Sequence, residues 1–404
     1  MPFPNFKIWS VVSLLSLSAL PACKQRKATD SNLEARESVY SEGAEPGEIT
    51  AKFKVPKSVE DCEKMSLENH FQDPNNKMQQ IVENANVVNM LPTPKDVYID
   101  AHCSNLFMKK HDPDKKGVIS IFGSSKLKEF HVAYHTLKKM VNQWTAKKTG
   151  ISVLTATGPG LMEAGNCGVN DKPDPSMPSL GYATTFEVPE KLKDKFKSGS
   201  RAWEVNKCTS NGYIFRSFGM RESEMIDRAR ISVLAPGGVG TEWEIYEIIS
   251  KIQTKKIPNN YGKGAPLVIL FMAAEEPQES TPTAQTMQTA IAGVKKITPD
   301  QIQLLKEVSD QKTRMNLYWK SLFTRLVAME AAGTILSHDL TLFRCGKTVD
   351  ETLEMMSKFQ PGVPLETSIG NLGSCEKELN DARKTLCSVE PTLNPELCKG
   401  SAEH

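Results

Sequence analysis

The middle of the chain alternates short apolar runs with amphipathic segments, and this alternation constrains the fold more than any other feature. The runs that predict strands are VISIF (118–122), ISVLT (151–155), LGYATTFEV (180–188), GYIFR (212–216), ISVLA (231–235) and PLVILF (266–271). The segments between them predict helices at 126–148, 160–168, 219–230 and 242–254. Such alternation is typical of βαβ crossovers. We therefore expect an α/β fold of the Rossmann-like, doubly wound kind, with a mostly parallel sheet.

The N-terminal stretch predicts export. Residues 1–22 hold one cation, Lys7, then an apolar stretch from Ile8 to Leu20, and the motif LPAC ends at Cys23. This apolar stretch is shorter than the ~20 residues of a membrane span and suits a cleaved signal, although a buried N-terminal helix is an alternative. The motif resembles a bacterial lipoprotein signal. The resemblance implies a lipid on Cys23 as the membrane anchor, and Lys24 favours the outer membrane, facing the periplasm, over the inner one.

The composition divides the rest of the chain into four parts. Residues 23–50 are polar and predict a flexible tether, and residues 51–112 predict a helical extension that includes MQQIVENANVVNML. The Rossmann-like domain is expected over 113–340, with a loop at 275–290 and a helical return around 312–335. Residues 341–404 are rich in cysteine and predict a small cross-linked appendage.

The cysteine count favours an oxidising compartment. Nine cysteines are present, and removal of Cys23 leaves an even eight that can pair fully. We expect disulfides mainly in the tail, with at least one bridge within a set of four: Cys345, Cys375, Cys387 and Cys398. A structural zinc site is not expected, because the chain has no CxxC pair and few histidines near its cysteines.

The charge balance argues against a nucleic-acid polymer as the partner. Lys and Arg together number 50 and Asp and Glu 48, so the formal net charge is +2. A protein that binds nucleic acid through its phosphates normally carries a basic patch or stripe, and none is visible here. A small anionic ligand remains compatible with this composition.

Three predicted strands end in loops of small residues: GSS (123–125), ATGPG (156–160) and PGGVGT (236–241). In open α/β sheets such loops bring backbone N–H groups and helix N-termini together at the carboxyl ends of the strands, and these groups suit phosphate. None of the loops is a Walker loop, and tight turns alone could explain the glycines. The predicted phosphate-binding residues are Gly123, Ser124, Gly158, Gly160, Gly237, Gly238, Gly240 and Thr241.

Two charged residues close to the third loop are open to two interpretations. Thr241 and Glu244 have the spacing of a capping box, in which both side chains bond free N–H groups at a helix start. Glu244 is alternatively a catalytic carboxylate. Arg221 opens the helix before the strand 231–235, so we expect it to face the same loop, although a lone surface Arg is usually only solvated.

These residues resemble a known family. PGGVGTEWE (236–244) matches the PGGxGTxxE signature of the Lonely guy family of cytokinin-riboside-monophosphate phosphoribohydrolases, and Arg221 has the spacing of the family's catalytic arginine. The similarity covers roughly 117–272. It implies a homodimer that hydrolyses the N-glycosidic bond of nucleoside 5′-monophosphates such as AMP. In that picture Arg221 and Glu244 are catalytic, loop amides hold the phosphate, and no metal or organic cofactor takes part.

The chain departs from the family pattern at two places. Glu222 stands where the family commonly has Lys, which reverses a charge near the proposed phosphate site. Ala156 and Thr157 stand where the family commonly has glycines, so their side chains are expected to narrow the pocket or to alter which base enters it. Both departures favour the alternative of a non-catalytic nucleotide-binding envelope lipoprotein. A purely structural envelope protein is a third interpretation. An amino-acid decarboxylase is not expected, because no lysine has a recognisable pyridoxal-phosphate context.

Overall fold

The computed structural model describes residues 56–58, 60–62, 94–171, 174–184, 187–188, 203–254, 266–275, 299–389 and 398. Several segments of the sequence analysis lie outside the described residues. They are the signal with Cys23, the tether, the expected helix at 78–91 and most of the loop at 275–290.

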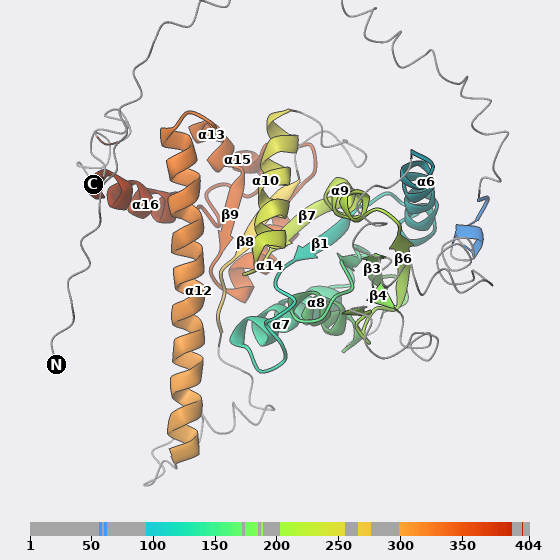
Figure 1. Cartoon of the computed structure of the whole chain (residues 1–404), viewed down its shortest axis with the longest axis horizontal. Coiled ribbons are helices and arrows are strands. Elements are labelled where there is room, and N and C mark those ends of the chain that lie inside the picture. Colours follow the sequence, from blue (N-terminus) through green and yellow to red (C-terminus); the bar gives the residue numbers. More distant parts are fainter. Residues whose placement is uncertain are drawn as a thin grey trace, which may run out of the picture. The chain divides into compact units, whose positions relative to one another are not determined.

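Seven strands form one parallel sheet in the order β6-β3-β2-β1-β7-β8-β9 (Figure 1). The strands are β1 (Val118–Phe122), β2 (Val153–Thr155), β3 (Ser179–Thr184), β6 (Asn211–Phe215), β7 (Ala229–Leu234), β8 (Leu267–Phe271) and β9 (Phe343–Gly346). From β1 the chain adds strands on one side and then, from β7, on the other. This confirms the predicted Rossmann-like, doubly wound fold. The order reverses between β1 and β7, and in such sheets ligands bind outside the carboxyl ends of the strands at this switch point.

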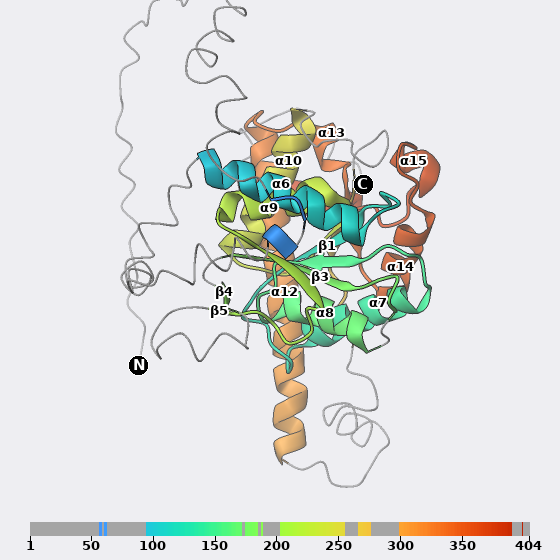
Figure 2. The ribbon, with the colours of Figure 1, turned by 90° about the vertical axis from the view of Figure 1, so that its right-hand side faces the viewer.

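Helices cover both faces of the sheet. Side chains of α6 (Pro94–His111), α9 (Phe218–Arg228), α10 (Val239–Gln253), α12 (Pro299–Ala331) and α16 (Glu376–Val389) share one core cluster with Val118 and Phe122 of β1. The other face packs Ile119 and Ile121 against α7 (Val132–Ala146), α8 (Leu161–Asn170) and α14 (Val349–Lys358). Figure 2 shows β1 and β3 between α6 and α9 on one side and α7 and α8 on the other. Two further helices, α13 (Ser337–Leu340) and α15 (Leu365–Ser368), are short. In the described ranges no helix is long and apolar enough to cross a bilayer.

The strand predicted at 180–188 is divided in the structure. Its first part is β3, and Glu187–Val188 forms a separate strand, β4, which pairs in parallel with β5 (Trp203–Glu204) in a two-stranded sheet. The other predicted strands agree with the observed ones to within two residues at each end.

The strand β9 lies where the sequence analysis placed a separate appendage. It pairs with β8 from Val268↔Phe343 to Phe271↔Gly346, so the cysteine-rich segment begins inside the main sheet. Phe343 and Cys345 are buried. The sequence signal was weak because the strand FRCG has four residues, one of them the charged Arg344. The following helices α14 and α16 pack on α7 and α12, respectively.

Four disulfides use all eight cysteines other than Cys23. The pairs are Cys62–Cys103, Cys167–Cys208, Cys345–Cys375 and Cys387–Cys398. The last two confirm the expectation of cross-links in the tail. The first two lie outside it and connect the segment before α6 to α6, and α8 to the turn before β6. Disulfides therefore cross-link the described part of the chain along its length.

Candidate functional site

The three glycine-containing loops meet at the carboxyl ends of β1, β2 and β7. The backbone N–H of Ser124 donates to the carbonyl oxygen of Pro236 at 3.1 Å, and the N–H of Leu161 donates to the carbonyl of Ser124 at 2.9 Å. The loop after β1 is therefore hydrogen-bonded to both other loops. A Cβ atom on Gly123 would lie 3.0 Å from Leu161 and 3.3 Å from Ala235, so this loop also packs tightly between its neighbours. The structure thus places the predicted loops at the switch point of the sheet.

The glycines in these loops have two different roles. Gly160 has a φ of +74°, and a Cβ atom there would overlap the carbonyl oxygen of Ser124. A Cβ atom on Gly237 would overlap the side chain of Thr241. Among the described residues, no heavy atom lies within 4 Å of a Cβ built on Gly238 or Gly240. The first pair is needed for packing, whereas the second pair leaves the backbone open to a ligand.

Two asparagines that the sequence analysis missed hold the loop after β2. The backbone N–H and the Nδ2 of Asn206 donate to the carbonyl of Thr157 at 2.8 and 3.0 Å, and the Nδ2 also donates to Gly158 at 3.2 Å. The same amide donates to Oδ1 of Asn166 at 2.9 Å. These contacts hold Thr157 at a φ of +61°, a conformation that favours glycine. No local pattern reveals them, because Asn206 is 49 residues from Thr157.

Ala156 and Thr157 are buried in the body of the domain. They are 4% and 1% exposed, and Cγ2 of Thr157 occupies the space beside Gly181 of β3. The expectation that these side chains narrow a pocket is therefore wrong for Thr157, whose methyl group packs against Gly181 of β3. The departure from a glycine run is accommodated inside the domain.

The helix α10 begins earlier than a capping box requires. Its N-cap is Gly238 and its first residue is Val239, so Thr241 is the third residue of the helix and Glu244 lies in the second turn. The capping-box interpretation of Glu244 is therefore wrong, because the N-cap is Gly238 and the helix starts two residues before Thr241. The N-cap residue, a glycine, has no side chain to cap this N-terminus. Free N–H groups and the helix dipole make such an end suitable for an anion.

Arg221 and Glu244 are both buried at this end of the sheet. They are 5% and 7% exposed. Nη1 of Arg221 lies 3.5 Å from the carbonyl of Ala156 at the end of β2, and its guanidinium carbon lies 4.5 Å from the ring centroid of Phe218. Within the described part of the chain, Nε of Arg221 and Oε2 of Glu244 have no hydrogen-bond partner. A buried polar atom without a partner is rare and costly, which marks these two side chains as candidates for ligand contact.

A second buried carboxylate, Glu222, accompanies this pair. It is 3% exposed, and its Oε1 lies 3.4 Å from Nη2 of Arg221. Burial raises the pKa of Glu222 to about 7, against the lowering effect of Arg221. Burial also raises the pKa of Glu244 to about 8; the charge of Arg221 opposes the rise, and those of Glu222 and Glu247 add to it. Perturbed carboxyl groups of this kind are typical of functional sites.

The long helix α12 also contributes to the site, which the sequence analysis did not predict. Arg325 on α12 pairs with Glu242 in the first turn of α10 at 2.5 Å. Burial raises the pKa of Tyr318 to about 12, and the negative charge of Glu242 raises it further. Tyr318 and Arg325 thus place α12 close to the first turn of α10. The sequence predicted a helix here but carried no signal for its neighbours.

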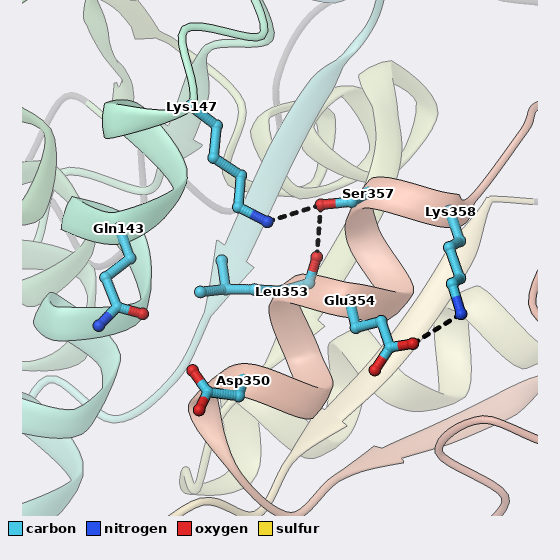
Figure 3. Close-up of a pocket in the computed structure, with 7 residues that line it drawn as sticks. All are labelled: Gln143, Lys147, Asp350, Leu353, Glu354, Ser357 and Lys358. Carbon is cyan, nitrogen blue, oxygen red and sulfur yellow. Dashed lines mark hydrogen bonds and ion pairs between the residues drawn. The ribbon is translucent and has the colours of Figure 1, made fainter.

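A pocket of about 390 Å³ lies between α7 and α14 and includes no residue of the three loops (Figure 3). Three of its four charged groups have partners within the pocket: Lys147 donates to Oγ of Ser357 at 2.9 Å, and Lys358 pairs with Glu354 at 2.6 Å. Because these charges are already paired, the pocket is a weaker candidate for the functional site than the switch point of the sheet. Across the described ranges, no group of three or more His, Cys, Asp or Glu side chains is arranged to hold a metal ion.

A comparison of the sequence with models of known protein families and with curated proteins finds no match. A functional inference therefore depends on the residues and geometry of the switch point. There the structure brings together the three loops, Arg221 and Glu244, as the sequence analysis expected. Cys23, the predicted lipidation site, lies outside the described residues.

Proposed function

We propose that the protein hydrolyses the N-glycosidic bond of nucleoside 5′-monophosphates, releasing the base and ribose 5-phosphate. The observation that carries the proposal is the burial of Arg221 and Glu244 beside the N-terminus of α10. Each has a polar atom for which the described residues provide no hydrogen-bond partner. The resemblance of PGGVGTEWE to the Lonely guy signature supports the same assignment.

In the proposed complex the N-terminus of α10 binds the phosphate. The open backbone at Gly238 and Gly240 and the first-turn N–H groups, including that of Thr241, supply the donors. The side chains of Arg221 and Glu244 contact the ribose and lie beside the glycosidic bond that breaks. Cleavage passes through a state with oxocarbenium character, and a carboxyl group beside it stabilises positive charge or moves a proton. This scheme uses protein groups and water and calls for no added cofactor.

The direct test incubates the full-length protein with each nucleoside monophosphate and measures free base by chromatography. The matched nucleosides, which lack the phosphate, are the control. We expect base release from at least one monophosphate and at least ten-fold slower release from its nucleoside, because the phosphate contacts position the substrate. Absence of base release from every monophosphate would contradict the proposal.

A second candidate is nucleotide binding without catalysis. The ion pair between Arg221 and Glu222 favours it, because this pair engages the guanidinium that the reaction needs. The two candidates differ in one measurement: a wild-type protein that binds AMP in calorimetry and releases no adenine is a binding protein.

We also propose that the protein is a homodimer. Val239 and Trp243 are four residues apart on α10, so they lie on one face of the helix, and they are 89% and 62% exposed. Exposed apolar side chains close to a site are typical of an interaction surface. Sedimentation analysis should show a dimer for the wild type and a monomer for Trp243→Glu.

The proposed location is the bacterial cell envelope, with a lipid on Cys23 as the anchor. The four disulfides support export, because such bonds persist in oxidising compartments. A fatty-acid probe should label the wild type in cells, and Cys23→Ser should remove the label. A wild type that stays unlabelled would refute the anchor.

A further inference from the structure

The interface of α9 and α10 holds more carboxylates than cations. Two cations, Arg221 and Lys251, face four carboxylates. Lys251 pairs with Asp227 at 2.7 Å and with Glu247 at 3.3 Å. Arg221 pairs with Glu222 at 3.4 Å, and its charge also acts on Glu244. Each cation is thus shared between two carboxyl groups.

The two pairs of carboxylates differ in their access to water. The side chains of Lys251, Asp227 and Glu247 are 15%, 21% and 18% exposed, so solvent screens part of their excess charge. The side chains of Arg221 and Glu222 are 6% and 4% exposed, and Glu244 as a residue is 7% exposed. An uncompensated charge at such depth is expensive, so a buried group takes up a proton instead.

The contacts decide which carboxyl group holds that proton. Burial raises the pKa of both groups, but Glu222 has the guanidinium of Arg221 as an ion-pair partner, which favours its ionised form and keeps its pKa, about 7, below that of Glu244, about 8. Oε2 of Glu244 has no partner among the described residues, and the negative charges of Glu222 and Glu247 oppose a further negative charge there. A protonated Oε2 has an O–H group to donate, and a ligand in the site is the natural acceptor.

We propose that Glu244 carries a proton at neutral pH and donates it to the departing base, and that Glu222 is the positioning residue that keeps Glu244 protonated. The catalytic part of this inference rests on the proposed hydrolysis. The protonation part is a property of the protein without substrate.

The step balances within the protein and water. As the bond between C1′ and the base nitrogen breaks, its electron pair stays with the base, and the proton of Glu244 moves to the base. The oxygen of a water molecule then bonds to C1′, and the proton lost by that water returns to the Glu244 carboxylate. The sum is nucleoside monophosphate plus water giving base plus ribose 5-phosphate, with Glu244 restored.

Glu222, which departs from the family pattern, has a defined role in this scheme. A lysine at position 222 would place a second cation beside Arg221. The carboxylates of the interface would then no longer outnumber its cations, and Glu244 would have no reason to hold a proton. Glu222 instead adds a negative charge that Glu244 senses more strongly than that of Glu247. The negative charge of Glu222 therefore favours the protonated form of Glu244, which can act as a proton donor.

The first experiment measures protonation without substrate. The full-length protein is labelled with ¹³C at the Glu side-chain carboxyl, Glu244→Gln assigns the signal of Glu244, and the remaining variants are titrated by NMR. We expect Glu244 to titrate above pH 7 in the wild type and at least one pH unit lower in Glu222→Gln. Glu222→Asp, which keeps the charge, should restore the high value, and Glu247→Gln should give a smaller shift than Glu222→Gln. Titration of wild-type Glu244 near pH 4.5, or no change in Glu222→Gln, would overturn the proposal.

The second experiment measures the pH dependence of kcat/KM for base release. If Glu244 must be protonated, the alkaline limb should move at least one unit to lower pH in Glu222→Gln, with kcat reduced several-fold at pH 8. A variant that becomes faster at neutral pH would show that Glu244 acts as a base and would overturn the proton-donor role. A wild type without base release refutes the proposed function, and the NMR titration still decides the protonation of Glu244.

Discussion

Two buried carboxyl groups on the same face of the sheet have opposite surroundings. Asp100 of α6 is fully buried and accepts hydrogen bonds from the hydroxyl of Tyr213 at 3.2 Å and from the backbone N–H groups of Arg216 and Ser217 at 3.0 and 2.8 Å. Glu244 of α10 is almost as deeply buried, but its Oε2 has no such donor in the described part of the chain.

The difference separates a structural carboxylate from a candidate catalytic one. Asp100 satisfies the donors at the start of α9 and joins this helix to α6. Burial raises the pKa of Asp100 to about 6, and the hydrogen bonds to its carboxylate and the charge of Arg216 oppose a larger rise. Glu244 lacks comparable donors, and its pKa reaches about 8. Burial alone does not mark a carboxyl group as functional. A buried carboxyl oxygen without a hydrogen-bond donor is the stronger sign of a functional site.

The largest expected effect is the loss of catalysis in Glu244→Gln. Base release from a nucleoside monophosphate should fall by ~10²- to 10⁴-fold, because an amide cannot transfer the proton. The melting temperature should stay the same or rise, since Glu244 makes no cap to lose. Glu354→Gln on α14, far from the three loops in sequence, is the control with wild-type turnover expected. Near-normal turnover in Glu244→Gln would remove Glu244 from the mechanism.

The converse variant, Asp100→Ala, should damage stability. It leaves the hydroxyl of Tyr213 and the N–H groups of Arg216 and Ser217 buried without their acceptor, at a cost of roughly 2 to 4 kcal/mol. Chemical denaturation of the variant measures this change in the free energy of unfolding. A loss below about 1 kcal/mol would contradict the structural role assigned to Asp100.

Asp100 and Glu244 are expected to affect the free energy of unfolding over different pH ranges. A carboxyl group whose folded pKa is raised holds a proton that the unfolded chain has released, so stability falls as pH rises between the two pKa values. For Asp100 this fall ends near pH 6, and for Glu244 it continues to about pH 8. Glu244→Gln should therefore be more stable than the wild type at pH 8, by on the order of 1 to 3 kcal/mol. Equal stability of the two proteins from pH 5 to 8 in urea titrations would mean that Glu244 is ionised at little cost.

The smallest effect is expected for Tyr213→Phe, which removes one of the donors to Asp100. The free energy of unfolding should fall by about 1 kcal/mol, and the pKa of Asp100 should rise, because a hydrogen bond to its ionised form is lost. Base release should be unchanged. A loss of catalysis in this variant would contradict the assignment of Asp100 to structure alone.

The sequence predicted the sheet well, because buried parallel strands are continuous apolar runs such as VISIF. It missed β9, which is four residues long and contains Arg344. The sequence also predicted that Arg221 and Glu244 lie close together, because loops that follow parallel strands converge at one edge of the sheet. It misjudged the start of α10, because a glycine N-cap leaves no side-chain signal.

The remaining features of the site depend on contacts that no local pattern encodes. Asn206 reaches Thr157 across 49 residues of chain, and Arg325 reaches Glu242 across 83. The pairing of Glu222 with Arg221 is adjacent in sequence, yet its importance comes from burial, which depends on how α9 and α10 pack. Such features follow from the folded structure alone.

The central claim is that the switch point with Arg221 and Glu244 cleaves nucleoside monophosphates, and product stoichiometry tests it most directly. Full-length protein is incubated with AMP, and free adenine and ribose 5-phosphate are quantified over time in wild type and Glu244→Gln. The account predicts that both products appear at a one-to-one ratio with the wild type and that neither accumulates with the variant. Adenosine and inorganic phosphate in place of adenine, or equal product formation by both proteins, would contradict it.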